Sequence, residues 1–168
     1  MKIKIVFAFI CLLMMVLPAT SCQKNSISAG NPAPDFELPR LDGESIALSS
    51  LQGRPVLLNF WALSCPYCLA EMPYIQQAHN TYSNEEQGLA VVTINIRDSS
   101  SAITSYLEYG NYNLKVLRDN GAHVATEYGV DGIPVTVLID KNGIIRDVVI
   151  GAFPNWPTLE NRLAAIIE

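Results

Sequence analysis

The chain has 168 residues, of which 49% are hydrophobic, and this length and composition fit one globular domain. Its 16 acidic residues outnumber its 11 basic ones, which gives a formal net charge of −5 at pH 7. An acidic chain argues against nucleic acid as a partner and against an electrostatic patch for anionic membranes.

The N-terminus has the pattern of an export signal. Lys2 and Lys4 give a basic start, and an apolar run follows over residues 5–17. This run is shorter than the ~20 residues that span a bilayer, and Pro18 ends it, so a retained membrane anchor is the least favoured interpretation. We therefore predict a signal peptide over residues 1–21.

The residues around the predicted cleavage point resemble a bacterial lipoprotein signal. This resemblance implies that Cys22 becomes the lipidated first residue and anchors the protein to a membrane, although Ala19 stands where such signals most often have leucine. Ala19 and Ser21 also satisfy the small-x-small rule of ordinary secretion, which would leave Cys22 unmodified. The first alternative gives an extracytoplasmic or periplasmic lipoprotein, and the second a secreted soluble protein.

Removal of the signal peptide changes both the charge and the cysteine count. The basic residues fall from 11 to 9 against 16 acidic ones, a formal charge of −7. Residues 22–34 are rich in Ser, Asn, Gly and Pro and predict a flexible tether, so the folded domain is expected over residues 35–168. Only Cys65 and Cys68 of the four cysteines remain in that domain. An exported pair forms a disulfide unless a reductant acts on it, so export implies an electron partner.

The domain is predicted to be an α/β fold in which strands and helices alternate. Residues 35–47 predict a hairpin around a turn at 41–44, and a polar loop follows over 48–54. The pattern then predicts two buried strands, at 55–61 and 89–96, and two further strands, at 114–117 and 135–140. It predicts helices at 65–82, 99–109 and 123–128, a hairpin at 141–143 into a strand at 144–150, and a closing helix at 157–167. Pro73 is expected to kink the first helix. The alternation predicts parallel strands with helices on both faces, and the last hairpin predicts an antiparallel edge, which together make a mixed sheet.

Two cysteines three residues apart stand at the start of the first long helix. Pro66 suits the first helical position, where its missing N–H has no helical partner. The spacing places both sulfurs on one face of the first turn, where free N–H groups and the helix dipole stabilise a thiolate. Cys65, nearest the helix end, is therefore the predicted nucleophile, and Cys68 is expected to resolve the mixed disulfide.

Two other interpretations of the cysteine pair are weaker. A structural disulfide across so short a loop would stabilise the fold little. A zinc site needs about four ligands, and the domain offers only His79 and His123 besides the two cysteines. No metal or cofactor is expected, because the two cysteines carry the electrons.

The motifs now in place resemble a known family. Cys65-Pro66-Tyr67-Cys68 after a strand that ends in Phe60-Trp61-Ala62, with Gly132-Ile133-Pro134 before a late strand, resembles the thioredoxin fold. The chain is most similar to extracytoplasmic, membrane-tethered thioredoxin-like proteins of the TlpA/ResA type, over nearly the whole domain. The blocks that carry this are Pro32–Phe36, Leu41–Gly43, Leu51–Trp61, Tyr128–Pro134 and Leu138–Gly143.

Three residues depart from the family pattern. Ser64 precedes the first cysteine where tryptophan is common, and Val135 follows Pro134 where threonine is frequent. The Pro-Tyr dipeptide between the cysteines is better known from glutaredoxins. Because that dipeptide influences the reduction potential, these departures leave open the direction of the reaction and the identity of the partner.

The resemblance implies roles for residues around the dithiol. The Ile133–Pro134 bond is expected to be cis and to face the cysteines, with the Ile133 backbone offered to a substrate strand; an ordinary trans turn is the alternative. Trp61 is expected to pack beside the site, either as a substrate-binding residue or as plain core, while Pro66 and Tyr67 shape an exposed rim.

Glu71 lies three residues after Cys68 on the same helix face. In ResA-type relatives a glutamate here tunes the proton chemistry of the dithiol. If it is partly buried, its pKa should rise, which would let it accept a proton from Cys68. The alternative is a solvated acid that only interacts favourably with the helix dipole.

The resemblance implies a thiol–disulfide oxidoreductase that reduces disulfides in client proteins, among them apocytochrome c during cytochrome c maturation, and that is re-reduced by a membrane thiol donor. A disulfide-donating oxidant would use the same two sulfurs. A copper-delivery protein would need three residues between its cysteines. A peroxiredoxin would need Pro-x-x-x-Thr/Ser-x-x-Cys, but Leu58 and Ala62 stand at those places before Cys65.

Overall fold

A five-stranded mixed sheet forms the centre of the protein. The structure is a computed structural model that describes residues 27–83 and 88–167, so the predicted signal peptide and Cys22 lie outside the described residues. Within the described part, the strand order is β5-β4-β3-β6-β7. The strands are β3 (Val56–Trp61), β4 (Ala90–Ile96), β5 (Lys115–Asp119), β6 (Val135–Ile139) and β7 (Ile145–Ile150). The first three run parallel, and β6 and β7 run antiparallel to their neighbours.

The direction of β6 corrects one expectation. The alternation of strands and helices predicted that this strand would be parallel, but it pairs antiparallel to β3, with Val135 opposite Phe60. The connection that contains α4 (His123–Glu127) packs against the face of the sheet formed by β3 and β4. It delivers the chain to the same end of the sheet at which β3, β4 and β5 finish, so β6 starts there and runs in the opposite direction.

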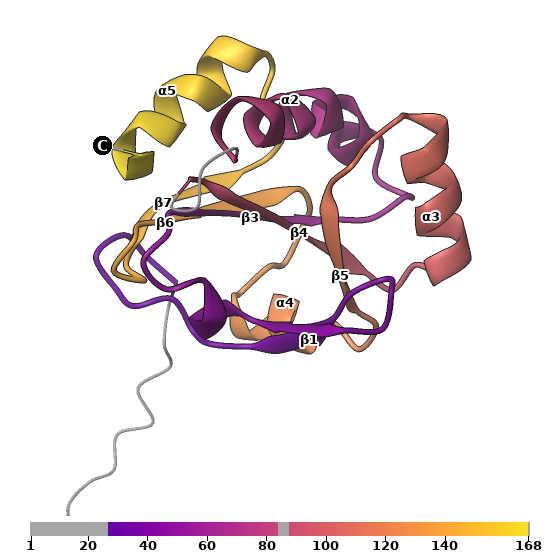
Figure 1. The fold of residues 1–168 in the computed structure, drawn as a ribbon, viewed down its shortest axis with the longest axis horizontal. Helices are drawn as coiled ribbons and strands as arrows, with labels where there is room; N and C mark the ends of the chain where they lie inside the picture. Colours follow the sequence, from indigo (N-terminus) through magenta and orange to yellow (C-terminus); the bar gives the residue numbers. More distant parts are fainter. Residues whose placement is uncertain (1–26, 84–87, 168) are drawn as a thin grey trace, which may run out of the picture.

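Helices cover both faces of the sheet. Figure 1 shows α2 (Pro66–Tyr82) and α5 (Trp156–Ile167) on one face, with α3 (Ser100–Tyr109) to the side, and α4 on the other face. Ser99 caps α3 by accepting a hydrogen bond from the Ala102 N–H at 3.3 Å, as its type favours. The helix α2 runs through Pro73.

The central strand β3 divides the core into two halves. All six of its residues are buried, and they alternate between the faces because successive side chains of a strand point in opposite directions. Leu58 and Phe60 pack in the cluster on the α4 side, and Leu57 and Trp61 pack with α2 and α5. In the described part of the chain, no helix is both long and apolar enough to cross a membrane.

Residues before the sheet pack against it. A small antiparallel sheet joins β1 (Glu37–Pro39) to β2 (Ser45–Ala47), which confirms the predicted hairpin, and the 3-10 helix η1 (Leu48–Leu51) follows. The Gly30 N–H donates to the Ile145 carbonyl at 2.8 Å, and the Ala33 N–H donates to the Gly143 carbonyl at 2.9 Å. Part of the predicted tether therefore contacts the sheet, and Ile27 and Ala33 pack against the core.

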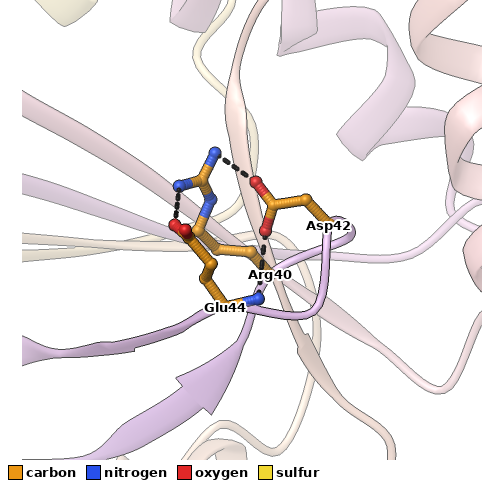
Figure 2. A network of polar contacts seen from close by, with 3 residues as sticks. All are labelled: Arg40, Asp42 and Glu44. Carbon is orange, nitrogen blue, oxygen red and sulfur yellow. Dashed lines mark hydrogen bonds and ion pairs between the residues drawn. The ribbon is translucent and has the colours of Figure 1, made fainter.

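Ion pairs between charged side chains lie at the turn of this first hairpin. Figure 2 shows Arg40 between two carboxylates, with Asp42 at 2.6 Å and Glu44 at 3.1 Å. The Arg40 backbone also forms a bridge with Leu117 of β5, which attaches the hairpin to the edge of the central sheet. Because exposed ion pairs contribute little to stability, we attribute the hairpin's position mainly to its buried side chains, Phe36 and Leu38.

Candidate active site

Cys65 and Cys68 form a disulfide at the N-terminus of α2. Cys65 occupies the N-cap in an extended conformation, and its Sγ accepts a hydrogen bond from the Cys68 N–H at 3.1 Å. Pro66 takes the first helical position. The Cys65 residue is 9% exposed and Cys68 is 0% exposed, so an external thiol or disulfide meets Cys65 first.

The loop that leads into the disulfide is held by an acid from the next strand. Asp98 follows β4, and its Oδ2 accepts hydrogen bonds from the Leu63 N–H at 2.7 Å and from the Asn95 side chain at 2.9 Å. The Cys65 N–H donates to the Ala62 carbonyl at 3.2 Å. These contacts fix the turn between the end of β3 and the start of α2, where Cys65 stands.

The start of β6 meets the disulfide from the other side. The Ile133–Pro134 peptide bond is cis, as the sequence predicted. The Ile133 carbonyl oxygen lies 3.6 Å from Cys65 Sγ, so the fold brings together two segments separated by 68 residues. Pro134 is buried and its carbonyl accepts the Gly151 N–H at 2.9 Å, whereas Ile133 is only half-buried. Ile133 is thus the residue of the pair that borders the surface at Cys65.

The predicted rim residues divide into two groups. Tyr67 is 73% exposed, and Pro66 is exposed beside it. Trp61 is fully buried in the same core cluster as the two cysteines, with its ring centroid 5.6 Å from that of Tyr106. A fully buried indole has no surface to offer a substrate, so we correct the substrate-binding assignment of Trp61 to packing that supports the disulfide.

Glu71 is the buried acid of the site. Its side chain is 0% exposed, which contradicts the alternative of a solvated acid. Its Oε1 accepts a hydrogen bond from Asn59 Nδ2 and its Oε2 accepts one from the Phe153 N–H, each at 2.9 Å. Burial raises the pKa of Glu71 above its ordinary value, and the N–H donors of Phe153 and Asn59 offset only part of that effect. The structure therefore places a buried carboxyl group with a raised pKa one helical turn beyond Cys68.

Sequence reasoning missed two partners of Glu71. Asn59 is a polar residue in the middle of the apolar run of β3, and that break in hydrophobicity was a usable signal. Phe153 acts through its backbone, which leaves no signature in the sequence. Among residues 27–83 and 88–167, no group of three or more His, Cys, Asp or Glu side chains is placed to hold a metal ion. The site thus combines Cys65 at the surface, a buried Cys68 and a buried carboxyl group, and the two cysteines can carry out thiol–disulfide exchange.

Comparison with known proteins agrees with this chemistry. Residues 29–148 match the AhpC/TSA family. The thiol-disulfide oxidoreductase ResA of Bacillus subtilis is 34% identical over 148 residues, which cover 88% of this chain and 82% of that protein. The ResA protein of Geobacillus thermodenitrificans is 32% identical over 129 residues, which cover 77% and 73% of the two chains.

Solved structures give the same picture. A structure from Chlorobium tepidum, described as a candidate thiol:disulfide interchange protein DsbE, has a TM-score of 0.75 at 32% identity and covers 83% of this chain and 99% of its own. A secreted Mycobacterium tuberculosis disulfide oxidoreductase has a TM-score of 0.69 at 28% identity, covering 78% and 96%. The chain belongs to the AhpC/TSA family and is a thioredoxin-like thiol–disulfide oxidoreductase of the ResA type.

Proposed function

We propose that the protein is a reductase of client disulfides that works outside the cytoplasm while tethered to a membrane. The observation that carries this direction is Glu71, a buried acid one helical turn after the buried Cys68. A proton acceptor there favours formation of the Cys68 thiolate, and that thiolate is the group that discharges a mixed disulfide between Cys65 and a client.

The reaction balances without a cofactor. The Cys65 thiolate attacks a client disulfide, which forms a mixed disulfide and releases one client thiolate that takes up a proton. Cys68 gives its proton to Glu71 and attacks Cys65 Sγ, which forms the Cys65–Cys68 disulfide and releases the second client thiolate. Two electrons pass to the client, and the proton on Glu71 leaves to the second client thiolate or to water.

The site residues take the following roles in this proposal. Cys65 is the nucleophile, Cys68 the resolving cysteine and Glu71 the proton acceptor. The Ile133 backbone, positioned by Pro134, pairs with the client strand beside Cys65, and Pro66 and Tyr67 form the exposed rim that the client contacts. A membrane thiol donor re-reduces the disulfide, and apocytochrome c is one client class that the ResA-type similarity supports.

The reduction potential of the Cys65–Cys68 couple tests the direction. We expect a value near or below the roughly −270 mV of thioredoxin, measured by equilibrating the purified protein with glutathione or dithiothreitol redox buffers. A value towards roughly −120 mV, the range of a strong oxidant, would reverse the direction. Failure of the pair to exchange with any external thiol would overturn the function itself.

The anchor has its own test. The proposal is that residues 1–21 are removed as a lipoprotein signal and that Cys22 carries the lipid, since Cys22 directly follows the small residues at the end of the leader. Cells that express the full chain should incorporate labelled palmitate into it, and Cys22→Ser should lose the label and release the protein from membranes. Cys11→Ser is the matched control, because that cysteine lies within the proposed signal peptide. Equal labelling of both variants would contradict the anchor.

A further inference from the structure

The strand β3 carries an amide at the point where the carboxylate of Glu71 reaches the sheet. Asn59 is fully buried and is paired in register with Thr93 of β4 on one side and Thr136 of β6 on the other. Its Nδ2 uses both N–H bonds, donating to Glu71 Oε1 at 2.9 Å and to Thr136 Oγ1 at 3.0 Å. Its Oδ1 is buried and has no hydrogen-bond partner among the described residues.

An unpartnered buried acceptor in a site that handles protons calls for an explanation. Both oxygens of Glu71 face N–H donors, from Asn59 and Phe153, and this arrangement suits a carboxylate, which only accepts. The acid form carries an O–H that needs an acceptor. A rotation of the Asn59 side-chain amide by about 180° exchanges Oδ1 and Nδ2. The Oδ1 atom then faces Glu71 Oε1 and the Thr136 hydroxyl, and both of those groups can donate a hydrogen bond to it.

We propose that Asn59 is a positioning residue for proton transfer at Glu71, and that its amide turns over when Glu71 gains or loses a proton. In the disulfide form described here, the amide holds the carboxylate through Nδ2. When Cys68 gives up its proton during resolution of a mixed disulfide, the new O–H of Glu71 finds an acceptor in Oδ1. The amide thus serves both charge states of the acid without moving the backbone. This inference rests on the proposed function, because it names the residue that supports the same proton transfer.

Few charged or titratable groups surround Glu71 in the described part of the chain. On its own helix α2, Cys68 lies one turn before it and Cys65 nearly two turns before it, and the two are joined as a disulfide. Its hydrogen-bond partners from other elements are neutral, namely the Asn59 amide of β3 and the Phe153 N–H before α5, and Thr136 of β6 bonds to Asn59. Within the described ranges, no Lys, Arg or His is recorded in an ion pair with Glu71. The amide is therefore the only side chain recorded as donating to the carboxylate within those ranges.

The rotation of the Asn59 side-chain amide can be followed directly by NMR in the purified, oxidised protein. We expect the side-chain amide signals of Asn59 to move with the same pH midpoint as the carboxyl carbon of Glu71. Nuclear Overhauser contacts from the amide protons to the Thr136 side chain should be strong above that midpoint and weaken below it. Amide signals and contacts that stay constant while Glu71 titrates would overturn the proposal.

Two threonines that flank Asn59 provide matched variants to test whether its hydrogen bonds affect the titration of Glu71. Thr136→Val removes the hydroxyl that bonds the amide, whereas Thr93→Val removes a buried hydroxyl that donates instead to the Lys115 carbonyl. We expect Thr136→Val to move the Glu71 midpoint to higher pH and Thr93→Val to leave it unchanged. Equal shifts, or no shift, in the two variants would overturn the inference even if Asn59 variants fail to fold.

Asn59→Leu gives the larger expected effect. This substitution removes a hydrogen bond to the carboxylate at nearly unchanged side-chain volume, and hydrogen bonds to charged groups are among the stronger ones. Because a smaller fraction of Glu71 is then ionised at pH values below the midpoint, resolution of the mixed disulfide should slow about tenfold there. The Glu71 midpoint should move to higher pH in the same variant. A wild-type protein that does not exchange thiols would refute the proposed function. If the protein is active but the pH midpoint of the Glu71 titration is the same in the wild type and in Asn59→Leu, only this inference would be refuted.

Discussion

Cys65→Ser is expected to abolish turnover with any disulfide substrate. Cys65 is the more exposed of the two sulfurs, it caps the helix and it lies beside the Ile133 carbonyl, so no second thiol is placed to replace it in the described part of the chain. Serine is a poor nucleophile at neutral pH, and we expect a loss of about a thousandfold or more, to the limit of detection. The measurement is reduction of a disulfide-containing peptide in single-turnover experiments that start from the fully reduced protein, with the wild-type dithiol as the reference.

Substitution of Cys68 should block a different step of the reaction. Cys68→Ser leaves the nucleophile intact but removes the group that resolves the intermediate, so the protein should accumulate as a mixed disulfide with its substrate, visible by mass spectrometry. Ser64→Ala, an exposed neighbour of Cys65, is the control and should turn over normally. A Cys65→Ser protein that still forms a mixed disulfide through Cys68 would contradict the assigned order of attack.

Glu71→Gln is the second substitution with a large expected effect. Proton transfer by a positioned group typically contributes 10²-fold or more, so the resolving step should slow by about a hundredfold near neutral pH, while formation of the mixed disulfide at Cys65 stays close to normal. In the wild type, the resolving step should accelerate as pH rises through the raised pKa of Glu71, because the carboxylate is the form that accepts the proton. The glutamine variant should lose that rise.

Stability provides an independent readout of the same carboxyl group. Because burial raises its pKa above the ordinary value of 4.5, folding favours the protonated form. Its contribution to stability is therefore fully present below pH 4.5 and is lost as pH rises through the folded-state pKa. Urea unfolding across this range should show the wild type losing free energy of unfolding relative to Glu71→Gln. Glu108→Gln, at an exposed site, is the control; a wild type that instead gained stability relative to Glu71→Gln would show that the N–H donors dominate.

Most element boundaries followed from local signals. Pro66 marked the start of α2, Ser99 marked the start of α3, and the Asn142-Gly143 turn marked the last hairpin, and each of these features acts within a few residues of itself. The predicted direction of β6 was wrong because it depends on the end of the sheet that the chain reaches after α4. That end is set by how the connection packs on the assembled sheet and not by any one segment.

The site was predictable only in part for the same reason. The disulfide and the cis bond before β6 carry short motifs, so their residues were found. The burial of Glu71 depends on the Phe153 backbone 82 residues later and on an amide from a neighbouring strand, and the helix alone leaves the acid free to be solvated. Trp61 was ambiguous because a residue at a strand end can face either the surface or the core.

The segment around residues 30–33 has a consequence for how the molecule meets its partners. It joins β7 beside the β6–β7 turn, at the opposite end of the sheet from the disulfide, since β6 runs from Pro134 beside Cys65 to Ile139 beside the start of β3. In the membrane-anchored form proposed above, the tether therefore enters the domain at the end of the sheet opposite the disulfide. Under that proposal the disulfide faces away from the membrane, where client proteins in solution reach it directly. The proposed membrane thiol donor would reach the same disulfide only after the whole domain reorients, so shortening the tether should slow re-reduction more than it slows client reduction.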